Sequence, residues 1–297
     1  MNFVAILAGV GSAVCFAVAS ALEQSAAKRE QLAQNLDPRL LLRLARRPRW
    51  LLGWIPEGIG VGLQALALSL APLALVEPLL ISGLFLAIPL AAALNRRRMY
   101  AWDFGVVALG GSGLVVFLLA AQPRAGVAQP SLTGWLGVAI WAGPALVACL
   151  MVAWRVVGPL RGALLGVATG LLYGLGASLL KTISDDLATD PLSVLTTPQL
   201  YVLVLVGGSA VVLNQHAFQS GRIAVPLTAI AVMDPFVSVL IGVTAFHEQL
   251  ATGWPRIGVQ VLGVLAMAGG IWLAAISRES RDVSPARSDS DPSERSG

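Results

Sequence analysis

An acidic residue interrupts a long apolar segment in the C-terminal third of the chain. In "AVMDPFVSVLIGVTAFHEQL", residues 231–250, Asp234 has apolar neighbours on both sides and Pro235 directly after it. A carboxyl group in apolar surroundings favours its protonated form, so Asp234 could release and rebind a proton. Asp-Pro is also a natural pair at a helix N-terminus, because proline prevents the hydrogen bond of an uninterrupted helix. The pair predicts a helix that breaks and restarts here, with Asp234 as a cap, a proton carrier or both.

Three consecutive polar residues lie in a second apolar segment. Asn214, Gln215 and His216 would point about 100° apart on a helix, so at most two of them can face one cavity. Asn214 matches Gln64 of an earlier segment, and two amides facing a central site would suit a polar substrate. The alternative is hydrogen bonding between helices, which is worth roughly 0.6–2 kcal/mol in membranes. His216 is a candidate proton relay.

Two further acids lie close to prolines. Glu57 follows Pro56, and either an ion pair with a loop arginine or a water-lined vestibule would explain it. Glu77 precedes Pro78, and we expect it to cap the start of an apolar segment near the outer face. The candidate pathway residues are therefore Asp234, Gln64, Asn214, Gln215, Glu57 and His216, and the candidate helix breaks or caps are Pro235, Glu77 and Pro78.

Two charged residues are expected near the outer face. Glu248 ends an apolar segment, where a helix cap or an aqueous role fits it best. Lys181 lies near the outer end of another segment, from which its ammonium group can reach water. An anion-attracting role is the alternative for Lys181.

The composition places these residues in a membrane protein. The chain has 297 residues, of which 56% are hydrophobic and 12% charged, and its mean hydropathy is +0.77. Soluble domains are typically about a quarter charged. The apolar residues form blocks of about 20, which is roughly the length that crosses 30 Å of hydrocarbon as a helix. The sequence predicts an all-α, polytopic helical membrane protein.

The apolar blocks predict nine transmembrane helices. The fifth stands alone as a linker span within residues 122–158, between a first unit at 1–121 and a second at 159–276. A tail at 277–297 lacks apolar runs and is expected to be disordered. The predicted spans are 3–22, 51–71, 75–95, 101–121, 134–154, 160–182, 199–218, 223–245 and 254–276.

Lysine and arginine alternate between the loops. The loops after the odd-numbered spans carry 13 of them, and the loops and edges after the even-numbered spans carry 3. By the positive-inside rule, this places the N-terminus outside a cell membrane and the C-terminus in the cytoplasm. The basic residues thus mark orientation, not nucleic-acid binding. The basic loop 23–50 either holds a short helix on the anionic inner leaflet or is a solvated loop.

The two units resemble each other. Residues 5–24 can be laid over 162–181, and residues 62–80 over 212–230. Because one extra span separates the units, the second would be inverted relative to the first, as in many secondary transporters.

The second unit resembles the drug/metabolite transporter superfamily with its EamA-type repeats. The pattern of that family is an Ala-aromatic pair, a Gly turn, a Pro and a Glu that ends an apolar span. In this sequence it reads Ala217-Phe218, Gly221, Pro226 and Glu248. The resemblance implies two inverted EamA-like repeats. The first unit departs from the pattern, because residues 95–98 read Asn-Arg-Arg-Arg where that Glu is expected.

The first unit also resembles NIPA-type magnesium transporters, which carry an acid and an Asn ahead of an Ala-Pro turn. Counting back from Ala71-Pro72, Gln64 takes the Asn position and Val61 the acid position. The sequence therefore has an amide side chain at the Asn position but no acid at the acid position. Glu57 lies one helical turn earlier.

These observations favour a secondary transporter of a small metabolite that is coupled to protons and works by alternating access. A magnesium or other divalent-cation transporter is the alternative, and it predicts several carboxylates around the pore. A membrane scaffold without transport activity is a further alternative. We expect no enzyme, metal or cofactor, because no catalytic constellation gathers at one depth. The expected partners are a small molecule or ion and the bilayer, with a homodimer left open.

Overall fold

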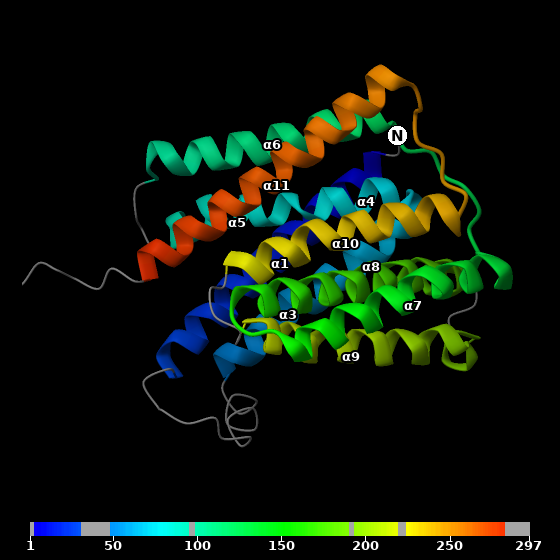
Figure 1. Cartoon of the computed structure of the whole chain (residues 1–297), viewed down its shortest axis with the longest axis horizontal. Helices are drawn as coiled ribbons and strands as arrows, with labels where there is room; N and C mark the ends of the chain where they lie inside the picture. Colours follow the sequence, from blue (N-terminus) through cyan, green and yellow to red (C-terminus); the bar gives the residue numbers. More distant parts are fainter. Residues whose placement is uncertain (1–2, 31–47, 95–98, 190–192, 219–223, 283–297) are drawn as a thin grey trace, which may run out of the picture.

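The computed structural model describes residues 3–30, 48–94, 99–189, 193–218 and 224–282, and these are almost entirely α-helical (Figure 1). The predicted surface helix falls on residues 31–47, outside the described ranges, as does most of the predicted tail. The elements are α1 (Phe3–Glu30), α3 (Pro48–Leu70), α4 (Leu73–Leu80), α5 (Ser82–Leu94), α6 (Ala101–Ala121), α7 (Leu132–Arg155), α8 (Pro159–Thr189), the 3-10 turn η1 (Ser193–Thr196), α9 (Pro198–Phe218), α10 (Ala224–Thr244) and α11 (Trp254–Asp282).

The helices have the length and composition of membrane spans. Within the described ranges, seven stretches are long and apolar enough to cross a bilayer, and two shorter apolar stretches accompany them at Phe3–Ala19 and Ile55–Leu70. The prediction of an all-α integral membrane protein is therefore confirmed.

Several predicted boundaries differ from the observed ones. The third predicted span, 75–95, is two helices, α4 and α5, which meet at Ile81. Helix α1 extends into the predicted loop 23–50, and α11 extends six residues into the predicted tail, to Asp282. Polar residues also form helices. A helix can therefore continue beyond the point where its apolar segment ends.

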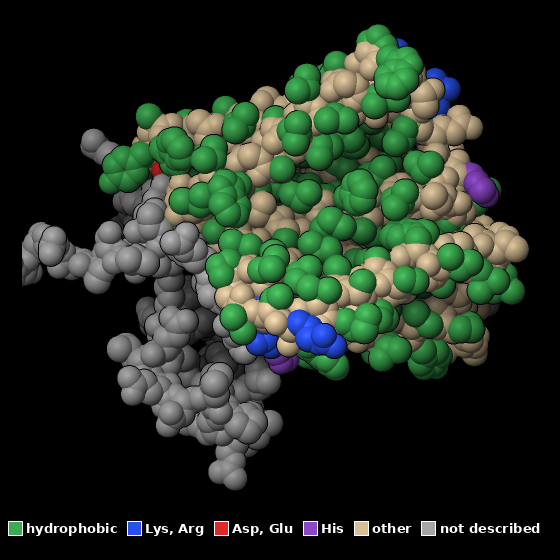
Figure 2. All heavy atoms as spheres, in the orientation of Figure 1, with side chains coloured by type: hydrophobic (Ala, Val, Ile, Leu, Met, Phe, Trp, Pro, Cys, Tyr) green, Lys and Arg blue, Asp and Glu red, His purple; other side chains and the backbone are tan. Residues whose placement is uncertain are grey.

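The surface matches a membrane environment. Hydrophobic side chains cover the middle of the face shown in Figure 2, and the Lys and Arg side chains visible on it lie near the two ends of the helices. Three highly exposed tryptophans also lie at helix ends: Trp102 in α6, Trp154 in α7 and Trp254 in α11. Tryptophan prefers the interface between lipid and water, so these residues mark the two edges of the apolar band.

Glycines allow two close helix crossings. Helices α6 and α11 lie side by side (Figure 1), and a Cβ on Gly113 would lie 2.7 Å from the Met267 nitrogen and 2.8 Å from the Gly263 oxygen. Helices α8 and α10 cross in the same way, because a Cβ on Gly170 would lie 2.9 Å from the Ile230 oxygen. Small residues let membrane helices approach to backbone contact, as they do here.

The predicted break at Asp234 and Pro235 is not found. Helix α10 runs from Ala224 to Thr244 with Pro235 inside it, so the packing of α10 against α8 holds the helix together despite one missing hydrogen bond. The chain instead breaks between α3 and α4, where Pro72 has an extended backbone conformation with φ −65° and ψ 149°.

Candidate functional site

A cavity of about 630 Å³ lies at the centre of the bundle. Helices α1, α3, α4, α5, α8, α9 and α10 all contribute to its wall. Three carboxyl groups line it, those of Glu57, Glu77 and Asp234, together with the amide of Gln64 and the phenol of Tyr173. Most of the other lining residues are apolar. The cavity therefore collects Asp234, Gln64 and Glu57, three of the six predicted pathway residues.

Glu77 lies in this cavity and not at a helix start. It is inside α4, only 3% of its surface is exposed, and its Oε1 accepts a hydrogen bond of 3.0 Å from the Gln64 amide. The prediction that Glu77 caps the start of a span near the outer face is therefore wrong. The turn at Ala71 and Pro72 is buried within the protein, so α4 does not start at an exposed surface. Pro78 likewise lies within α4 and breaks nothing.

Asp234 presents an unpartnered oxygen. The residue is partly buried, but its Oδ1 atom is buried and has no hydrogen-bond partner among the described residues. Its carboxyl interacts electrostatically with Glu77 on the neighbouring helix α4. Because Pro235 has no N–H, the Ala231 carbonyl also lacks its usual helical donor. Asp234 thus adds a buried acceptor to the wall, and Ala231 lies in the same wall.

The three consecutive polar residues of α9 are not part of the cavity wall. Gln215 and His216 are exposed, and His216 Nδ1 lies 2.8 Å from the Val212 carbonyl of its own helix. Asn214 reaches the cavity only indirectly, because its amide nitrogen donates to the Tyr173 hydroxyl at 3.4 Å. The proton relay proposed for His216 therefore gains no support from its position.

Lys181 caps the end of α3 at one end of the cavity. Its Nζ donates to the carbonyls of Leu68 and Ala71, both at 2.9 Å, and it lies 5.6 Å from the centre of the Phe246 ring. Lys181 therefore does not extend toward water as predicted. It satisfies the last carbonyls of α3, which have no partner within the helix.

Glu248 caps the start of α4 beside Lys181. Its two carboxylate oxygens accept hydrogen bonds from the backbone nitrogens of Leu73, at 2.7 Å, and Ala74, at 3.0 Å, and its Oε1 lies 4.0 Å from Lys181 Nζ. Burial raises the pKa of the Glu248 carboxyl, while the Ala74 N–H, Lys181 and the Leu73 N–H lower it. The cap alternative for Glu248 fits this geometry, and the capped helix is α4.

Together with Phe246, these two residues pack around the turn between α3 and α4. Phe246 is fully buried in a cluster of apolar side chains that fills the space between the α3–α4 turn and the end of α10. We call Lys181, Phe246 and Glu248 the closing layer. The sequence places Lys181 and Glu248 near the outer face separately, because only the fold brings positions 181 and 248 together.

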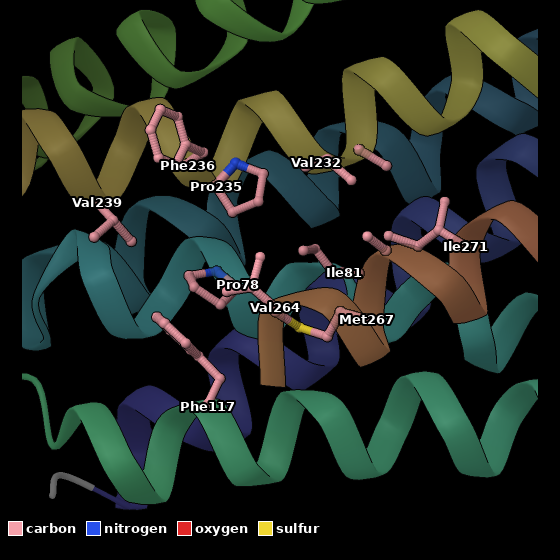
Figure 3. Close-up of a pocket in the computed structure, with 12 residues that line it drawn as sticks. Pro78, Ile81, Phe117, Val232, Pro235, Phe236, Val239, Val264, Met267 and Ile271 are labelled. Carbon is pink, nitrogen blue, oxygen red and sulfur yellow. The ribbon is translucent and has the colours of Figure 1, made fainter. Parts of the chain in front are cut away.

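A smaller apolar pocket of about 80 Å³ lies between α4, the junction at Ile81, α6, α10 and α11 (Figure 3). Pro78 and Pro235 approach each other there from α4 and α10, with Phe117, Val264 and Met267 around them. Each proline follows a cavity carboxyl in the chain. The two acid-proline pairs thus separate the polar cavity from a purely apolar pocket that is too small for a metabolite.

The carboxyl groups do not form an obvious metal site. In the parts of the chain that the structure describes, no group of three or more His, Cys, Asp or Glu residues lies close enough together to hold a metal ion. The divalent-cation alternative predicts several carboxylates around the pore, and three line this cavity, because Glu77 is buried there beside Asp234 and Glu57.

Comparison with known proteins gives one distant relative. The chain is 23% identical over 265 residues to an uncharacterized protein of Corynebacterium glutamicum, covering 88% of this chain and 92% of that protein. No family model matches the chain, and no solved structure matches it. The comparisons and the fold together describe a polytopic helical membrane protein that is distantly similar to this Corynebacterium protein.

Proposed function

We propose that this protein is a secondary transporter that moves a small solute by alternating access, with proton binding at Asp234 coupled to transport. The observation that carries the proposal is the central cavity, in which a buried carboxylate oxygen without a partner among the described residues lies within mostly apolar walls. Ionisable groups inside membrane spans mark substrate, ion or proton pathways. A scaffold without transport activity would have no need for such a cavity.

An internal symmetry of the chain supports the proposal. A separation of 157 residues relates Phe16 to Tyr173 and Glu77 to Asp234, and all four residues line the central cavity, whereas the segments 62–80 and 212–230 are 150 residues apart. Helix contacts repeat as well. Helix α1 packs on α3 and on α4–α5, just as α8 packs on α9 and α10, and α6 pairs with α11. This correspondence favours two inverted repeats, in line with the resemblance to EamA-type transporters.

The closing layer supports alternating access. It packs at the end of the bundle where α3 ends, and we infer that it seals the cavity there, whereas Glu57 and Leu227 line the wall toward the opposite end. With the orientation predicted from basic loops, the sealed end faces outward and the cavity faces the cytoplasm. In the proposed cycle, the closing layer separates while the opposite end closes.

The test is transport in proteoliposomes loaded with a pH-sensitive dye. We expect an added pool of metabolites to drive proton movement in the native protein but not in Asp234→Asn. The matched control is Asp186→Asn, which makes the same chemical change at a carboxyl that accepts a hydrogen bond from Gln129 outside the cavity. Full coupled transport by Asp234→Asn would remove the proton role from this residue.

A divalent-cation transporter is the second candidate, because the cavity holds three carboxyls, as that hypothesis requires. Magnesium keeps several waters and needs only one or two carboxylates in many sites, so a hydrated ion would not require a closed ligand set. Entry of Mg²⁺ into dye-loaded vesicles without any metabolite would favour this candidate. Glu57 and Gln64 would then be the first residues to substitute.

A further inference from the structure

A polar pocket of about 250 Å³ at one end of the bundle carries an inference about a second binding site. Two arginines, Arg124 and Arg256, line it together with Gln122, Gln249 and Thr252. We propose that this pocket binds a phosphate group of net negative charge between the two guanidinium groups. The pocket shares no lining residue with the central cavity, so the inference goes beyond the proposed transport function.

Two connections that are far apart in the sequence hold the pocket in shape. The α6–α7 connection and the α10–α11 connection pair through their backbones. The Arg124 nitrogen donates to the Gln249 carbonyl at 2.9 Å, and the Gln249 nitrogen donates to the Arg124 carbonyl at 3.1 Å. The Ala251 nitrogen also donates to the Ala121 carbonyl, at 2.7 Å. Because these bonds use only backbone atoms, they fix the base of the pocket and leave the Arg124 side chain available to a ligand.

The charge of the pocket favours an anion. Its described lining includes two guanidinium groups but no Asp or Glu. Within the part of the chain that the structure describes, no ion pair occupies either arginine, and Arg256 makes a long hydrogen bond of 3.4 Å to Gln122 Oε1. A concave site lined by one sign of charge attracts ligands of the opposite sign. The pocket therefore attracts anions and repels cations.

The chemistry of the lining suits phosphate. A guanidinium group presents paired N–H donors that match two oxygens of a phosphate. A phosphate group has oxygens on several sides, so it can accept from Arg124 and Arg256 at once. Gln249 and Thr252 add neutral hydrogen-bonding groups from the α10–α11 connection.

The position of the pocket is that of lipid headgroups. Trp254, the first residue of α11, is 90% exposed, and tryptophan prefers the interface between lipid and water. Figure 2 shows basic side chains at this end of the bundle, beside the start of α11. Ile257 and Val261 follow on α11 with exposed apolar side chains, along which the chains of a lipid can lie. The phosphate can thus belong to a lipid headgroup or come from water as a soluble ion.

The distribution of basic residues is an independent argument for this site. The loops and edges after the even-numbered predicted spans carry three basic residues, Arg124, Lys181 and Arg256. Lys181 belongs to the closing layer, and the other two line this one pocket. The positive-inside rule explains basic residues on the opposite face and not these two. Their convergence from separate connections therefore indicates a binding role.

The test is binding to the purified full-length protein in lipid-free detergent. Dioctanoyl phosphatidylglycerol is counted by native mass spectrometry, with dioctanoylglycerol as its phosphate-free control, and radiolabelled inorganic phosphate is measured by equilibrium dialysis. We expect one phosphate-bearing probe per chain and no dioctanoylglycerol. Arg124→Gln and Arg256→Gln should each weaken binding about tenfold, as expected for the loss of one charge-assisted hydrogen bond. The matched control is Arg155→Gln, which removes an exposed arginine at the end of α7 outside the pocket and should leave binding unchanged.

The two probes distinguish the sources of the phosphate. Binding of phosphatidylglycerol without binding of inorganic phosphate would assign the pocket to a lipid headgroup, and binding of both with similar affinity would assign it to a soluble phosphate. Three results would overturn the inference. These are binding of neither probe, equal binding of dioctanoylglycerol, and losses in Arg124→Gln and Arg256→Gln that do not exceed the loss in Arg155→Gln. Size-exclusion chromatography confirms that each variant is folded.

Discussion

At the scale of single residues, the closing layer gives the clearest energetic argument. Lys181 and Glu248 are both buried, and each also satisfies backbone groups at the α3–α4 break. Removing one partner of a buried ion pair leaves the other charge unpaired, which typically costs about 3–5 kcal/mol. Replacing both partners by apolar residues of similar size avoids that cost. The layer therefore predicts a difference between single and double variants.

We expect Lys181→Met to lower the free energy of unfolding by about 3–5 kcal/mol. The double variant Lys181→Met/Glu248→Met should be less destabilised than this single variant, although α4 then loses its cap. The measurement is denaturant unfolding of the purified protein in detergent. A double variant that loses as much as the sum of the two single variants would show that Lys181 and Glu248 do not interact.

Asp234 and Glu77 show what the sequence could and could not predict. Asp234 was identified because an acid inside an apolar block is visible in the sequence. Glu77 was assigned to the membrane surface, since hydropathy cannot tell that the turn at Ala71 and Pro72 is buried under the loop that carries Phe246 and Glu248. Glu77 and Asp234 are 157 residues apart, the same separation as in the overlay of 5–24 on 162–181, and this was the available signal for the place of Glu77 in the cavity.

At the scale of helices, spans were predictable where composition alone sets their length. Helix α6 covers the predicted 101–121, because apolar content ends where the bilayer does. The break predicted at Asp234 and Pro235 was wrong because packing against a neighbouring helix, and not composition, decides the structure there. A local rule about proline was overridden by packing, since α8 contributes glycines that let it contact the backbone of α10. Sequence alone does not state which neighbour a helix will have.

The crossing of α6 and α11 gives a prediction with an internal control. A side chain at Gly113 would meet the backbone of α11 at 2.7 Å, whereas a Cβ at Gly111, two residues earlier, would have no neighbour within 4 Å. We expect Gly113→Val to lower the thermal stability of the protein in detergent, by about 1–3 kcal/mol for overpacking. Gly111→Val should leave stability unchanged. Equal effects from both variants would contradict the close crossing.

At the scale of the whole molecule, successive spans run in alternate directions, so the loops divide between two faces (Figure 1). Val127 lies in the connection between α6 and α7, and Val157 in the connection between α7 and α8, at opposite ends of the bundle. Both side chains are exposed. The distribution of basic residues predicts that the face with Val157 is cytoplasmic. These two positions therefore report the orientation of the protein in the membrane.

Labelling of single cysteines from outside the cell tests this orientation and the closed end together. In a chain with Cys15→Ala and Cys149→Ala, a membrane-impermeant thiol reagent should label Val127→Cys in intact cells and Val157→Cys only in inverted vesicles. Leu227 lies in the cavity wall. Under the proposal that the closing layer blocks the other end, Leu227→Cys should be labelled from the same side as Val157→Cys. Labelling of Leu227→Cys from the side of Val127 would place the open end of the cavity opposite to the one proposed. If Val157→Cys reacted in intact cells and Val127→Cys did not, the predicted orientation itself would be reversed.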